Sequence, residues 1–347
     1  MIEIAAYHDG VELTHLARME WVDGLGDVAD SCSAEWLGDP LPTVEAPPDG
    51  HVTLSVDGEQ LGPYDVLSAG ISGEEMRRRL SGAVAHHFEA EVADRDDESS
   101  IYGAIIDAVA SYAARTPWTD WIATRQSALF MRQSVAAELF RADSLAATRQ
   151  ILAKWGLTVI PTMSGSGTSI SYGVEVRPLF PLLRGIDIPL DAAYLSAARE
   201  IEMADGANAP GRFRDRRIVG MHRRLGVIED DPILVESGAT KPALYLAPTG
   251  NLLSMELAVH VERWRLQNSS MSCRIVYYRY DPAIVPQRII TLPADYTGDE
   301  ADTAWHIESI HHRWDADQGY RAEIAAALWQ GPPITVAARR TQIGGAP

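Results

Sequence analysis

The chain has 347 residues, of which 46% are hydrophobic and 22% are charged. This length is more than one average domain uses, and this composition is typical of a folded globular protein and excludes a disordered one. The formal net charge of -18 argues against a surface that clamps nucleic acid by its phosphates, unless the charges are strongly segregated. An acidic chain suits solubility, and it equally suits a channel through which nucleic acid passes without sticking.

Few covalent or membrane features are expected. The two cysteines, Cys32 and Cys273, are far apart and lack the spacing of a metal site, which predicts a reducing compartment without a disulfide framework. The N-terminus lacks the basic region and apolar core of a signal peptide, and no apolar run approaches the ~20 residues that a membrane helix requires. We therefore expect no membrane insertion.

The first 73 residues have the pattern of short antiparallel strands. Asp-Gly pairs at 9–10 and 57–58 predict tight hairpin turns, and the prolines of 40–50 predict a loop. Strands are expected over 2–7, 11–22, 29–37, 51–56 and 60–71. Residues 1–73 are thus predicted to form a first small β-barrel or sandwich, to which strands from 157–190 can add.

Residues 74–156 are predicted to form a helical section. Apolar residues recur at near-helical spacing over 74–88 and 101–112, separated by an acidic, solvated linker at 89–98. A further helix is expected through 145–155, because Asp143 or Ser144 can cap its start and Gly156 can end it.

A mixed connecting section is predicted over 157–250. Ser164–Gly167 reads S-G-S-G, which predicts a loop but lacks the lysine and the following serine or threonine of a phosphate-binding P-loop. A strand is expected over 170–176, a helix from Asp191 through Ile201, and a linker over 242–250.

One basic concentration stands out in this acidic chain. Arginine suits protein interfaces because its planar guanidinium pairs with a carboxylate through two N–H groups. The alternatives for the cluster are an exposed loop, a contact between subunits, or a contact with nucleic acid. Its members are Arg212, Arg214, Arg216, Arg217, Arg223 and Arg224.

Residues 251–347 are predicted to form a second β-barrel with one helix, at 252–266. Strands are expected over 273–280 and 288–292, followed by a hairpin at 304–330. In that hairpin every second residue from Tyr320 to Leu328 is apolar, the period of a strand with one buried face. The first arm changes parity partway, which predicts a bulge or burial on both faces.

Three separated blocks resemble the baseplate hub proteins of tailed phages, the late control protein D family. In the hairpin, the family pattern is W-x-V-x-x-V-x-H, a loop, then G-Y-x-T-x-L, and Ala322 stands where threonine is usual. The matching residues there are Trp305, His312, Gly319, Tyr320 and Arg321. The other blocks contain Asp27, Asp30, Ala34 and Trp36, and Gln133, Ser134, Leu152, Ala153 and Gly156.

The resemblance implies an α+β fold in which two antiparallel tube-type β-barrels flank the helical section. It implies a homotrimer forming a ring that joins the sixfold tail tube to a threefold tip and leaves a channel for DNA without specific binding. Its partners would be tail tube, distal tail and tip or spike proteins. The particle would be the tail of a phage, prophage or gene transfer agent, or a related injection machine, assembled in the bacterial host cytoplasm. No cofactor and no enzymatic activity are expected.

Two other classes stay open. One is an enzyme, either a tail-associated hydrolase or an unrelated metal-dependent one. A metal could be held by His306, His311 or His312 with Asp315, and His306 and His312 share a strand face if no bulge intervenes. A monomeric carbohydrate-binding protein could use exposed tryptophans, for which Trp118, Trp121 and Trp314 are the candidates. Gly165-Ser166-Gly167 falls short of a G-x-S-x-G nucleophile elbow, so no catalytic residue is predicted.

Overall fold

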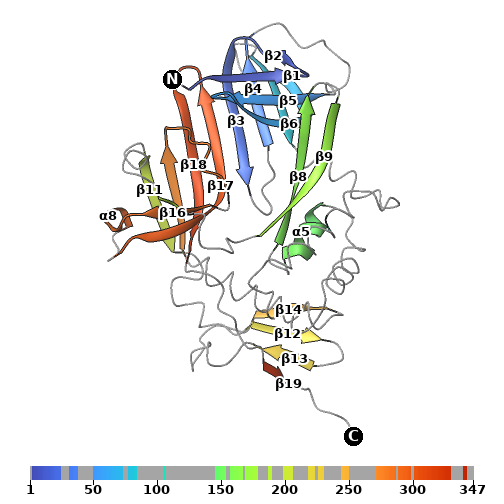
Figure 1. Ribbon diagram of the computed structural model, residues 1–347, viewed down its shortest axis with the longest axis vertical. Helices are drawn as coiled ribbons and strands as arrows, with labels where there is room; N and C mark the ends of the chain where they lie inside the picture. The colour runs from blue at the N-terminus through green and yellow to red at the C-terminus, as the bar shows by residue number, and fades with distance from the viewer. Residues whose placement is uncertain are drawn as a thin grey trace.

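The computed structural model in Figure 1 describes residues 2–24, 31–37, 50–72, 77–83, 105, 145–153, 157–166, 169–178, 187–189, 198–205, 218–222, 226–229, 244–249, 271–286, 288–297, 301–329 and 339–341. The acidic linker at 89–98, the helix at 252–266 and nearly all of the loop at 40–50 lie outside these residues. Of the helix expected at 101–112, only Ile105 is described, and it is helical and buried.

Most of the described chain forms one mixed sheet of 13 strands, in which every pair is antiparallel except β10 with β16. The strands are β1 (Ile4–His8), β2 (Val11–Glu12), β3 (Leu16–Gly24), β4 (Ser31–Trp36), β5 (His51–Val56), β6 (Glu59–Ser72), β7 (Arg77–Ala83), β10 (Asp187–Pro189), β11 (Ala198–Asp205), β15 (Met271–Tyr277), β16 (Ile289–Leu292), β17 (Thr303–Asp315) and β18 (Gly319–Leu328). Their order is β11-β15-β18-β17-β3-β4-β7-β6-β5-β1-β2, with β16 also beside β17.

The sheet joins the N-terminal strands to the hairpin formed by β17 and β18, here called the closing hairpin. Strand β17 pairs with β3 from Ser309 opposite Gly24 to Asp315 opposite Arg18. In Figure 1, β1 and β5 run across the upper end of the long strand β3, and β17 and β18 lie to the left of β3. Because β11 and β2 end the sheet on either side, the sheet is open, and the two closed barrels and the domain boundaries stay predictions.

Both Asp-Gly turns are confirmed. Asp9 and Gly10 have φ of 48° and 81°, and Asp57 and Gly58 have φ of 49° and 82°. Two successive positive values are the conformation of the hairpin turn whose twist matches that of the flanking strands. The turns set the registers of β1 with β2 and of β5 with β6.

Residues 77–83 form strand β7, so the helix predicted over 74–88 is wrong there. Leu80 and Gly82 are buried, and Leu80 pairs with Ala34 of β4. The apolar residues that suggested a helix are four positions apart, and a spacing of four keeps side chains on one face of a strand as well. Pairing on both sides, with β4 and β6, decides in favour of the strand.

Three further expectations in the connecting section are also wrong. Residues 198–205 form β11 beside β15 rather than a helix, and the linker at 242–250 contains strand β14 (Leu244–Thr249). The residues 164–166 of the expected loop belong to β8 (Leu157–Ser166). In each case pairing with a distant or adjacent strand overrides the local signal.

The rest of the described chain forms two smaller sheets and two helices. Strand β8 pairs with β9 (Ser169–Pro178), and helix α5 (Leu145–Ala153), which was predicted, packs on β8 with Arg149 Nε donating to the carbonyl of Val159 at 3.1 Å. A smaller sheet has the order β14, β12 (Ile218–His222), β13 (Gly226–Glu229) and β19 (Arg339–Thr341), and α8 (Ala294–Thr297) follows β16. Neither helix of the described residues has the length and apolarity to cross a bilayer.

The closing hairpin forms as predicted, with its bulge between Ile307 and Ser309. The bulge shifts side-chain parity, so that Trp305 and Ile307 before it lie on the same buried face as Ile310 and His312 after it. This inner face is continuous with buried residues of β3, β4 and β15, including Trp21, Ala34 and Ile275. The core therefore contains residues from both the N-terminal strands and the closing hairpin.

Candidate functional site

The face of the main sheet opposite the core, here called the outer face, has charged side chains on successive strands. Arg274 of β15 bonds to Glu323 of β18, with Nε and Oε2 2.9 Å apart, and to Glu202 of β11 at 3.3 Å. Arg321 donates to Glu323 Oε1 at 2.8 Å. Each of these carboxylates thus lies beside an arginine of its own or a neighbouring strand.

The same pattern continues across β17, β3, β4 and β7. Arg313 Nε lies 3.7 Å from Glu20 Oε1, and Arg18 Nε donates to the same oxygen at 3.0 Å. Arg79 Nε lies 3.9 Å from Glu35 Oε1. Opposite charges on neighbouring strands stabilise their register, while exposed pairs of this kind each contribute little to stability.

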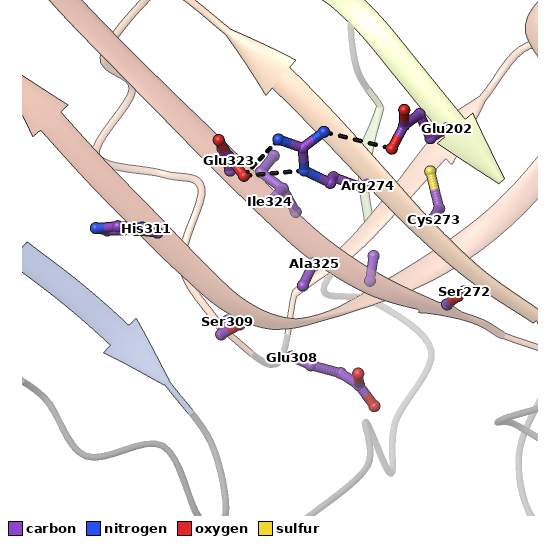
Figure 2. Close-up of a pocket in the computed structure, with 11 residues that line it drawn as sticks. Glu202, Ser272, Cys273, Arg274, Glu308, Ser309, His311, Glu323, Ile324 and Ala325 are labelled. Carbon is purple, nitrogen blue, oxygen red and sulfur yellow. Dashed lines mark hydrogen bonds and ion pairs between the residues drawn. The ribbon is translucent and has the colours of Figure 1, made fainter. Parts of the chain in front are cut away.

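A groove lies on the outer face over β15, β18 and β17 (Figure 2). Its volume is about 320 Å³. Small side chains form its floor, including Ser309 and Ala325, which pair across β17 and β18 next to the bulge. In Figure 2, Glu308 lies on one side of this floor, and Arg274 with Glu323 and Glu202 lies on the other.

Charge pairing sets the protonation of the Arg274 and Glu323 pair. Burial raises the pKa of Glu323, but hydrogen bonding and attraction from Arg274, together with Arg321, outweigh it and hold that pKa below its ordinary value. The hydrogen bond with Glu323 also raises the pKa of Arg274. Both groups are therefore charged at neutral pH.

We expect Glu323→Gln to destabilise the fold slightly at pH 7 and to have no effect in strong acid. A carboxylate whose pKa is lower in the folded state stabilises the fold above its unfolded pKa, and loses that contribution as the pH falls through the folded pKa. The measurement is the difference in melting temperature between wild type and variant from pH 7 to pH 3. A difference that grows toward acid would contradict the pairing.

On the inner face, an aromatic cluster joins the closing hairpin to β3. The rings of Trp21 and His312 are stacked at 4.5 Å with 4° between their planes, and Nδ1 of His312 lies 2.6 Å from the hydroxyl of Tyr320. His312 Nε2 lies 3.2 Å from Oδ2 of Asp23. Tyr280 packs edge-on against these rings, and its hydroxyl donates to Glu59 at 2.8 Å. Burial, together with that carboxylate, raises the pKa of Tyr280.

Comparison with solved structures finds two similar proteins, and each match covers almost the whole of both chains. The tail protein from Neisseria meningitidis MC58 is 13% identical with a TM-score of 0.56, over 94% of this chain and 96% of that one. The 43 kDa tail protein of prophage MuSo2 from Shewanella oneidensis is 12% identical with a TM-score of 0.57, over 94% and 98%. This chain has the fold of a phage tail protein. No protein-family model and no curated protein matches its sequence.

The tail-protein fold confirms the resemblance noted in the sequence as far as the fold, and it accounts for some of the matched residues. Trp305, His312 and Tyr320 all lie on the inner face, where their side chains are buried. Gly319 has a φ of 78° at the turn between the two strands, a conformation that glycine adopts without strain. The hairpin motif is thus a packing and turn motif.

Within the tail-protein fold the candidate metal ligands do not converge. The bulge places His306 opposite Ala327 on the outer side, whereas His312 lies opposite Ala322 on the inner side, so the shared face required for a two-histidine site is absent. His311 is exposed on the outer face. Among the described residues, no three histidines, cysteines or acidic residues are placed to hold a metal ion.

The other predicted site residues have different outcomes. All six arginines of 212–224 lie outside the described residues, as do Trp118 and Trp121. Trp314 is partly buried and packed against the core, so it is not an exposed sugar platform. Sequence reasoning missed Arg274, Glu202 and Glu323, because charges on alternate strand positions are common and the pairing of β11, β15 and β18 is not readable from spacing.

Proposed function

We propose that the chain is a structural hub of a phage-like tail, which forms a ring between the tail tube and the tip and leaves a channel for DNA. The observation that supports this most is the extent of the fold likeness, which covers 94% of this chain and 96% or more of two tail proteins. Similarity over almost the whole of both chains relates complete architectures rather than one common domain. The ring is a homotrimer, and its partners are tail tube, distal tail and tip proteins.

The charge of the chain supports a channel role. At -18 per chain, a ring of several copies is strongly acidic as a whole, which is consistent with an acidic wall around its opening. Phosphates are repelled by such a wall, so DNA can pass without being held. A protein that gripped DNA would need a basic surface facing the phosphates.

The test is the mass of the purified native protein by light scattering over a range of concentrations, followed by class averages in negative stain. We expect a mass of three chains and particles with a central opening. A protein that stays monomeric at every concentration and binds stoichiometric zinc would contradict the hub and favour the hydrolase.

A further inference from the structure

The groove of Figure 2 has an excess of negative charge. Its lining includes the carboxylates of Glu202, Glu308 and Glu323, and one guanidinium, that of Arg274. Glu202 and Glu308 are well exposed, at 60% and 51% of their side-chain surface. The groove therefore attracts a cation more than an anion.

The two sides of the groove differ in how their charge is balanced. Glu323 and Glu202 are bonded to Arg274. Glu308 lies on the opposite side, and among the described residues its only ion-pair partner is His306, at 3.5 Å. The small floor residues Ser309 and Ala325 leave space between these two sides. A long cationic side chain can lie along that floor, with its charged end at Glu308 or Glu202.

The chain has a concentrated source of such side chains. Six of its 30 basic residues, all arginine, lie within 212–224. Two copies that each have a net charge of -18 repel one another over long range, and a local contact of opposite charge opposes this repulsion. The basic segment and the acidic groove have complementary charges. A guanidinium also pairs with a carboxylate better than an ammonium group does.

We propose that the groove binds an arginine of the 212–224 segment of a second copy of this chain. This inference rests on the proposed function, because it names a contact that holds neighbouring subunits of the ring together. The carboxylate of Glu308 or that of Glu202 receives the guanidinium, and Arg274 remains bound to Glu323.

Charge reversal on each side tests the contact. The groove variant is Glu202→Arg with Glu308→Arg, and the segment variant is Arg216→Glu with Arg217→Glu. We expect each to weaken assembly about tenfold or more without unfolding the chain, because attraction becomes repulsion at the contact. A chain with all four changes restores opposite charges and is expected to regain most of the assembly. The measurement is native mass by light scattering against concentration, with circular dichroism to confirm folding.

The matched control reverses two exposed glutamates at the other end of the sheet. Glu3 directly precedes β1 and Glu12 lies on β2. Both strands are far from β11 and β15 in the strand order of the sheet. Glu3→Arg with Glu12→Arg changes the net charge by the same amount as the groove variant. Assembly that falls equally in the control would show an effect of net charge alone and would overturn the proposal.

A second measurement does not depend on ring formation. A fluorescent peptide of residues 210–224 is titrated with the full-length protein, and anisotropy reports binding. We expect binding to the wild type that weakens about tenfold with the groove variant and is unchanged with the control. A peptide that binds both variants equally, or does not bind the wild type, overturns the groove assignment.

The outcomes separate this inference from the proposed function. A trimer whose mass is insensitive to both reversals contradicts the groove contact and leaves the hub intact. A segment reversal that lowers the melting temperature while the mass is unchanged places the contact within one chain and overturns the contact between copies. A protein that is monomeric in every variant contradicts the ring and this contact between its subunits.

Discussion

Replacing Trp21 with alanine is expected to lower the free energy of unfolding by about 4 kcal/mol, the range for a buried tryptophan truncated in a core. The Trp21 side chain is 1% exposed and is stacked on His312. It lies where β3 meets the closing hairpin, so the cavity would open between the two ends of the chain. Chemical denaturation monitored by far-UV circular dichroism measures the loss.

The control for this prediction is Val22→Ala. Val22 follows Trp21 on β3 but lies on the outer face, where it is partly exposed. We expect this variant to lose about 1 kcal/mol or less, since most of the truncated surface is not taken from the core. Equal losses for the two variants would mean that the inner face at this point is not packed as described.

Replacing His312 with alanine is expected to cost about 3 kcal/mol, because it removes a stacked ring from the core together with the hydrogen bond between His312 and the Tyr320 hydroxyl. His312 is only 2% exposed. The measurement is again the free energy of unfolding. Tyr320→Phe removes the hydroxyl alone, and we expect it to cost about 1 kcal/mol.

His311→Ala supplies the matched control for that variant. His311 is the next residue in the chain, lies on the outer face and is exposed. We expect its replacement to change stability by less than about 0.5 kcal/mol. If the two histidines had equal effects, the parity of β17 after the bulge would be wrong.

Much of the local structure is readable from the sequence. Each Asp-Gly pair predicts a turn because both residues adopt the positive φ that a tight hairpin requires. The alternation from Tyr320 to Leu328 identifies the buried face of β18. The change of parity in the first arm correctly indicates the bulge between Ile307 and Ser309. These signals depend on residues that are close in the chain.

The pairing of distant strands is not readable in this way. Nothing near Gly24 indicates that it pairs with Ser309, and nothing near Glu202 indicates that it bonds to Arg274. The outer-face groove depends on such pairings, because its charged residues come from β11, β15, β17 and β18. The spacing of these residues in the sequence therefore does not indicate that they line one groove.

The pairing of β3 with β17 also has a consequence for synthesis. Strand β3 leaves the ribosome long before β17 exists, so one edge of the N-terminal strands stays unpaired until nearly the whole chain has been made. Contacts between such distant segments slow folding, because the entropy of closing the long loop is lost before the contacts form. An unpaired strand edge meanwhile offers hydrogen bonds to other chains. The edge of β3 that β17 later covers is therefore a place where the growing chain can pair wrongly with another chain.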